Sequence, residues 1–213
     1  MKRTIVRHAA IASLALTLSV GLAACGGEDD GNDSAASDNT SQTTESSPSE
    51  TASESAADQT FGAGCSAIPT DGAGSFDGMV TEPVANAASA NPLLKTLVAA
   101  VTAADLVDTL NSAPALTVFA PTDDAFAKIP KKDLDAVLAD KPTLTKILTH
   151  HVVEGQLGPD EVVGTHDTLA GDKITVKGSG EDYTVENAAI VCGNIPTANA
   201  TVYVIDTVMM PKM

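Results

Sequence analysis

The side chains best suited to acid–base or metal chemistry are few and scattered along this chain of 213 residues. They are His8, the doublet His150–His151, His166 beside Asp167, Glu154 and the pair Asp123–Asp124. His150 and His166 could hold a metal ion with the nearby acids, but adjacent histidines on a strand point to opposite faces, which disfavours the site. We interpret Asp123–Asp124 as a solvated helix start, where acids face the positive end of the helix. The sequence therefore predicts neither a metal ion nor a cofactor.

Nucleophilic catalysis needs a nucleophile, an adjacent base and a group that orients the base. The sequence contains no Gly-x-Ser-x-Gly motif, no glycine loop of the phosphate-binding type and no pair of histidines at helical spacing. We therefore expect a protein that is not an enzyme.

The charge balance excludes nucleic acid as an expected partner. The formal net charge is −16, and residues 61–213 hold 19 acidic residues against nine lysines and no arginine. Phosphate backbones require neutralisation by Lys and Arg, which this composition does not supply. Trp is absent and aromatic residues make up 3% of the chain, so stacking platforms for bases or sugars are not expected either.

The N-terminus has the three-part layout of a secretory signal peptide, with basic residues, the apolar run Ala9–Val20 and then small residues. The run is shorter than the roughly 20 residues that span a bilayer. It leads into Leu22-Ala23-Ala24-Cys25, which resembles the bacterial lipobox. We predict a lipoprotein signal peptide over residues 1–24 and a lipidated Cys25 that anchors the mature chain in the membrane. The alternative is an ordinary secretory signal that happens to precede a cysteine.

Residues 26–60 carry nine acids, no Lys or Arg, and mostly Ser, Thr and Ala. Such a segment buries too little apolar surface to offset the entropy of ordering. We therefore predict a disordered tether after Cys25, over residues 25–60, with a reach of roughly 30–35 Å. A folded domain is expected over residues 61–213.

Two cysteines remain once Cys25 is assigned to the anchor. An even pair in an exported chain predicts a disulfide between Cys65 and Cys192. Two buried free thiols are the alternative, and two cysteines without further ligands fall short of a metal site.

The first half of the domain reads as helical and the second half as strands. Apolar periodicity and caps predict helices over 82–90, 93–101 after an Asn91 N-cap, 104–110, 131–139 and from Pro142 onward. A strand over 116–120 precedes a helix capped by Thr122. From His150, period-two patterns predict strands over 151–153, 165–169, 172–177, 183–186, 189–192 and 201–209. Helices followed by a run of strands indicate the α+β class.

Three segments resemble the motifs of the fasciclin (FAS1) domain family, in the same order. They are TVFAPTDDAF (117–126), the first signature box; ILTHHVVEG (147–155), the central segment; and VYVIDTVMMP (202–211), the second box. Within the family the chain is most similar to fasciclin-type surface lipoprotein antigens of mycobacteria. The resemblance covers roughly residues 75–211. It implies a wedge of two β-sheets flanked by helices, a role in adhesion or surface interaction, and no enzymatic activity.

The resemblance also singles out two candidate binding residues. His151 matches the histidine of the central motif, and His150 stands where the family usually has Tyr. The alternative is a structural role, in which His151 is buried and hydrogen-bonded to the backbone or to a carboxylate.

These observations favour a lipid-anchored lipoprotein on the extracytoplasmic face of the cell membrane. Its expected partners are the membrane, through the anchor, and an unidentified envelope or extracellular protein or glycan. The alternative is a carrier of a lipid or small solute, which would need an apolar cavity of several hundred Å³.

Overall fold

The computed structural model describes residues 55–211. The predicted signal peptide, the predicted lipid-anchor residue Cys25 and residues 26–54 of the predicted tether lie outside the described residues. Two 3-10 helices open the described part, η1 (Ala56–Gln59) and η2 (Ala63–Ala67). Because η1 packs against α1 and β6, residues 56–59 belong to the folded domain, although the sequence assigned them to the tether. Among residues 55–211, no helix is long and apolar enough to cross a membrane.

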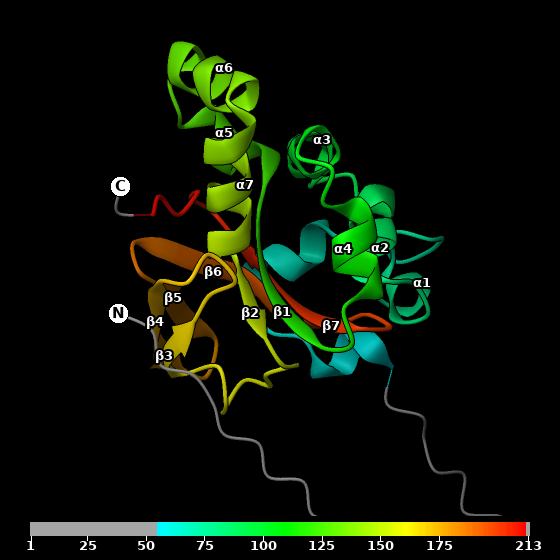
Figure 1. Cartoon of the computed structure of the whole chain (residues 1–213). Coiled ribbons are helices and arrows are strands. Elements are labelled where there is room, and N and C mark those ends of the chain that lie inside the picture. The colour runs from blue at the N-terminus through cyan, green and yellow to red at the C-terminus, as the bar shows by residue number, and fades with distance from the viewer. Residues whose placement is uncertain (1–54, 212–213) are drawn as a thin grey trace, which may run out of the picture. The chain divides into compact units, whose positions relative to one another are not determined.

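Seven α-helices and seven β-strands follow within the described residues. The helices are α1 (Phe76–Val80), α2 (Val84–Ala90), α3 (Lys95–Ala103), α4 (Val107–Ser112), α5 (Asp123–Ala127), α6 (Lys131–Ala139) and α7 (Lys141–His150). The strands are β1 (Leu116–Pro121), β2 (Val152–Glu154), β3 (Gly164–Asp167), β4 (Lys173–Ser179), β5 (Asp182–Val185), β6 (Ala188–Pro196) and β7 (Ala200–Ile205). The α+β class is confirmed. In Figure 1, α1–α4 gather on one side of β1 and α5–α7 on the other.

The strands of residues 55–211 form one seven-stranded sheet in the order β2-β1-β7-β6-β5-β4-β3, where the resemblance implied a wedge of two sheets. The β1–β7 pair is parallel and the other pairs are antiparallel. Bulges in β6 around Cys192 bend the sheet. The two ends approach one another, because Val153 pairs with Thr168 in an isolated bridge. The two halves of the expected wedge are therefore continuous through β6 and β7.

The alternation of side chains along the central strands separates two apolar clusters. Val118 on β1 and Val202 and Val204 on β7 face the helices, in one cluster. Phe119 and Tyr203 face the inside of the curled sheet, in the other. Successive side chains of a strand point to opposite faces, so the period of two in both signature boxes serves two cores at once.

A strap of residues 55–68 fastens the start of the domain to β6. A disulfide joins Cys65 to Cys192, as the sequence predicts, with the two Cα atoms 4.9 Å apart. Phe61 forms a two-way backbone bridge with Gly193, and its ring centroid lies 4.8 Å from that of Tyr183. A side chain at Gly193 would collide with the Phe61 ring, so this glycine is required for the close approach.

Local hydrogen bonds explain where the element boundaries differ from the expected ones. The last strand ends at Ile205 instead of Met209, because the Asp206 side chain bonds to Ala189 N and Met209 N donates to a histidine. Asn91 does not cap α3, which begins at Lys95. Asp123 supplies that cap, since its Oδ1 accepts from Thr96 N at 2.7 Å. Asp123 is therefore half-buried and structural, not simply solvated.

Candidate functional site

His150 and His151 stand at the end of α7 and not on a strand, which corrects the expected position of the doublet. The buried face of α7 consists of Leu144, Ile147, Leu148 and His150, so the helical period continues to His150, and His151 is the C-cap. The prediction of two histidines on opposite faces of a strand is therefore wrong. Both residues are 2% exposed.

The His151 side chain is saturated by the backbone. Its Nδ1 donates to the Ile147 carbonyl at 2.8 Å, and its Nε2 accepts from Met209 N at 3.0 Å. Burial lowers the pKa of His151 to about 4, so the ring is neutral at physiological pH. The interpretation of His151 as a buried histidine bonded to the backbone is confirmed, and in this conformation it cannot contact a partner.

His150 lies between two carboxylates. Its Nδ1 is 2.7 Å from Asp172 Oδ1 and its Nε2 is 3.4 Å from Glu186 Oε2. Burial raises the pKa of Asp172, but hydrogen bonds from Thr168 and His150 outweigh it and hold that pKa below its usual value. The cluster joins α7 to the turns after β3 and β5, which gives His150 a structural role here.

The structure does not assemble the metal site considered from the sequence. His166 Nε2 donates to the Val162 carbonyl at 2.8 Å, away from the acids around His150. Among residues 55–211, no three His, Cys, Asp or Glu side chains are placed to hold a metal ion.

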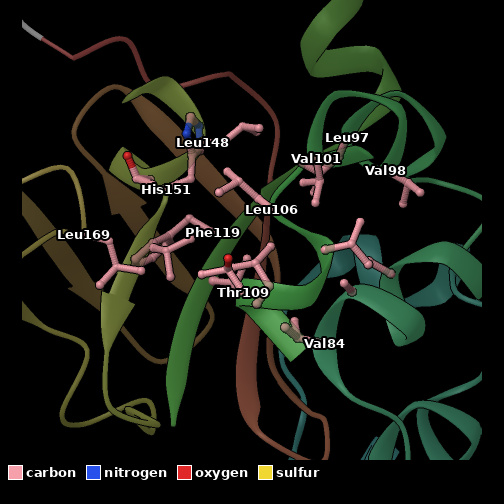
Figure 2. A pocket seen from close by; sticks show the side chains of 17 residues that line it. Val84, Leu97, Val98, Val101, Leu106, Thr109, Phe119, Leu148, His151 and Leu169 are labelled. Carbon is pink, nitrogen blue, oxygen red and sulfur yellow. The ribbon is translucent and has the colours of Figure 1, made fainter. Parts of the chain in front are cut away.

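An apolar pocket lies between the helices α2–α4 and the elements β1 and α7 (Figure 2). Its walls include Ala85 on α2, Val98 and Val101 on α3, Phe119 on β1 and Leu148 on α7. The cavity volume is about 60 Å³. Enclosed sites for whole drug-sized ligands are about 300–1,000 Å³. The pocket is thus smaller than the cavity that the carrier alternative requires.

Sequence reasoning missed this pocket and the residue that shapes its far wall. Asn199, in the turn between β6 and β7, is 9% exposed. Its Oδ1 accepts from Val84 N at 2.9 Å, and its Nδ2 donates to the carbonyls of Leu110 and Ala113 at 2.8 and 2.9 Å. It thereby fixes the start of α2 and the end of α4. Val84 lies 115 positions from Asn199 and Leu110 lies 89 positions from it, so no local sequence pattern predicts these hydrogen bonds.

The two signature boxes meet at a second feature, an open groove of about 620 Å³ beside the disulfide. Thr122, Asp123 and Asp124 of the first box line it together with Val204 and Asp206 of the second. The parallel pairing of β1 with β7, with Pro121 opposite Ile205, brings these residues together. Lys128 Nζ lies 3.0 Å from Asp206 Oδ2 across the groove. The groove combines apolar walls with exposed charge, which suits a contact with another molecule.

Comparisons with known proteins agree with the three motifs. The model of the Fasciclin domain matches residues 92–211. The cell surface glycolipoprotein MPT83 of Mycobacterium tuberculosis (strain H37Rv) is 49% identical over 160 residues, covering 71% of this chain and 72% of the relative. The immunogenic protein MPB70 of Mycobacterium bovis is 50% identical over 165 residues, covering 73% and 84%.

A solved structure is also similar, the FAS1 domain pair from the insect cell adhesion molecule fasciclin I. The TM-score is 0.48 at 22% identity, and the match covers 55% of this chain and 45% of that chain. The family match over residues 92–211 and the half-identical relatives carry the assignment. This chain belongs to the fasciclin domain family.

Proposed function

We propose that the protein is a lipid-anchored surface lipoprotein whose fasciclin domain binds a protein or glycan of the envelope or the surroundings. One observation carries the proposal: Cys25 directly follows an apolar run and Leu22-Ala23-Ala24, in a chain of the fasciclin family. Two or more acyl chains hold a protein durably on a membrane, at about 0.8 kcal/mol per buried methylene. The printed name of one relative, a cell surface glycolipoprotein, supports the same location.

The role of the domain in this proposal is binding and not catalysis. The two histidines that the family resemblance singled out are buried and bonded within the fold. The groove between the signature boxes is the better candidate for the interaction face. It is open, and it places the exposed Asp124 beside the apolar Leu93 and Val191.

The anchor is tested with Cys25→Ala in the native host. The variant has no thiol to receive a diacylglyceryl group, so we expect it to leave the membrane fraction and collect in the medium. Membrane and medium fractions are compared by immunoblot. A variant that sediments with membranes as completely as the wild-type protein contradicts the anchor.

The interaction face is tested by a pull-down from envelope and matrix extracts, followed by titration of the captured partner. Asp124→Lys reverses a charge in the groove, whereas Asp160→Lys makes the same change at an exposed site outside the groove. We expect a loss of at least tenfold in affinity for Asp124→Lys and little change for Asp160→Lys. Equal affinities for both variants would move the interaction face elsewhere.

A further inference from the structure

We propose that the pocket between α2–α4 and β1–α7 binds a single hydrocarbon chain, of the kind found in membrane lipids. The pocket does not suit a polar ligand, because its lining offers almost no hydrogen-bonding groups that could orient one. Fourteen of the 17 lining residues are apolar, and the exceptions are Thr109, Thr149 and His151. Both ring nitrogens of His151 are already bonded to Ile147 and Met209, so the ring has no free donor or acceptor for a ligand. Specific recognition of a polar ligand needs convergent polar groups.

Leu106 is the lining residue that a bound chain would displace. Figure 2 shows its side chain reaching into the middle of the pocket, between Val101 and Phe119. Leu106 N donates to the Val101 carbonyl at 3.1 Å, which places Leu106 just after the left-handed residue Asp105 at the end of α3. The Leu106 side chain is only half-buried. A chain that displaces it exchanges one apolar contact for another, and the pocket lengthens without exposing a polar group.

The walls of the pocket differ in how firmly they are held. Asn199 fixes the end of α4 and the start of α2 through buried hydrogen bonds. At the other end of α4 the N-cap position is Leu106, whose apolar side chain cannot accept a hydrogen bond from the helix. There the corner between α3 and α4, residues 104–106, is tied to α7 by an ion pair between Asp105 and Lys141, both exposed. Exposed ion pairs stabilise weakly, so this corner is the part of the wall that can move.

The rim extends the apolar surface toward the outside. Leu169, in the turn after β3, is 38% exposed and lines the same pocket as Leu106. A chain that leaves the pocket at this rim would therefore contact the apolar side chain of Leu169. A whole lipid does not fit a pocket of about 60 Å³, but one chain entering end-on does not require the whole lipid to be enclosed. The choice of membrane lipid as the source rests on the proposed anchor, which holds the domain close to a bilayer.

The test uses the full chain carrying Cys25→Ala, which has no acyl group of its own to occupy the pocket. Hexanol, octanol and decanol are titrated against this protein and followed by the methyl NMR signals of Leu97, Val101 and Leu106. We expect saturable shifts at these methyls and an affinity that rises about fourfold for each added methylene. Flat affinity across the series, or shifts confined to other residues, overturns the proposal.

Matched variants locate the site. Ala85→Leu on α2 and Val98→Phe on α3 fill the pocket from two different helices, and each is expected to weaken decanol binding at least tenfold. Leu106→Ala enlarges the pocket and is expected to tighten binding at least threefold. Val163→Ala removes an apolar side chain that is 42% exposed outside the pocket and should leave binding unchanged. Dispersed methyl spectra identify the variants that fold. Undiminished binding by a folded filling variant contradicts the site, and because no membrane is present, this failure is separate from a failure of the anchor.

Discussion

The strap of residues 55–68 and the corner between α3 and α4 are both short, irregular segments packed beside the sheet, but they are held in different ways. The strap is fixed by the Cys65–Cys192 disulfide, by the Phe61–Gly193 bridge and by the contact of Phe61 with Tyr183. The α3–α4 corner is held by one turn of backbone hydrogen bonds and an exposed ion pair. The domain is therefore firm where the proposed tether enters it and yielding beside the apolar pocket. This difference is consistent with a domain that is attached through the strap and admits a ligand beside the α3–α4 corner.

Removal of the disulfide is expected to have the largest effect on stability. The double variant Cys65→Ala/Cys192→Ala removes a cross-link between two residues that are 127 positions apart. Loss of a native disulfide typically lowers the free energy of unfolding by about 2–5 kcal/mol. The measurement is denaturant unfolding of the double variant and of the oxidised wild-type protein. Amide exchange should then rise at Phe61 and Gly193 more than at Leu106. Equal increases at both places would remove the contrast between strap and corner.

Acidification is expected to lower the free energy of unfolding through His151, which lines the pocket. The pKa of His151 is about 4 in the folded state, because of burial, against 6.5 in the unfolded chain. The unfolded state thus binds a proton first, so the stability present above pH 6.5 is lost as the pH falls toward 4. The full effect is about 3 kcal/mol, to order of magnitude.

Denaturant unfolding at pH 7, 5.5 and 4.5 measures this loss. His151→Gln should be less stable at pH 7 and should lose this part of the pH dependence. Hydrogen bonds to the carboxylates of Asp172 and Asp206 outweigh burial and hold both pKa values below the usual value, so neither group accounts for a loss of stability between pH 7 and 4.5. A His151→Gln variant with the wild-type pH profile would show that another group titrates there.

The smallest effect is expected for Lys141→Ala at the corner. The pair with Asp105 is exposed at both partners, so its loss should change the unfolding free energy by less than about 1 kcal/mol. Lys173→Ala breaks the comparable exposed pair with Asp167 and serves as the control. Lys141→Ala should raise amide exchange at Leu106, and Lys173→Ala should not. A large stability loss for Lys141→Ala would mean that the corner is as firm as the strap.

Patterns carried by neighbouring residues were enough to predict much of this fold. The bounds of α6, Lys131–Ala139, were predicted without error, and Thr122 caps α5 by accepting from Ala125 N at 3.1 Å. The strand predicted over 116–120 corresponds to β1, Leu116–Pro121. Helical period, capping and strand alternation are local properties, so a sequence displays them directly.

Features that depend on distant residues escaped prediction. The pattern at 150–151 predicted the start of a strand, but α7, which packs against α3, α6 and β2, continues through His150. The capping role of Asp123 toward Thr96 spans 27 positions, and the reach of Asn199 to Val84 spans 115. The pocket arises from six elements together, so no single segment of the sequence carries its signature.

Mass spectrometry of the N-terminal peptide of the native protein, purified from membranes, tests the lipid anchor at Cys25. We predict that the mature chain begins at Cys25 and that this residue carries diacylglycerol, giving a peptide heavier than the unmodified one by the mass of the attached lipid. A mature chain that begins elsewhere, or an unmodified Cys25, would contradict it.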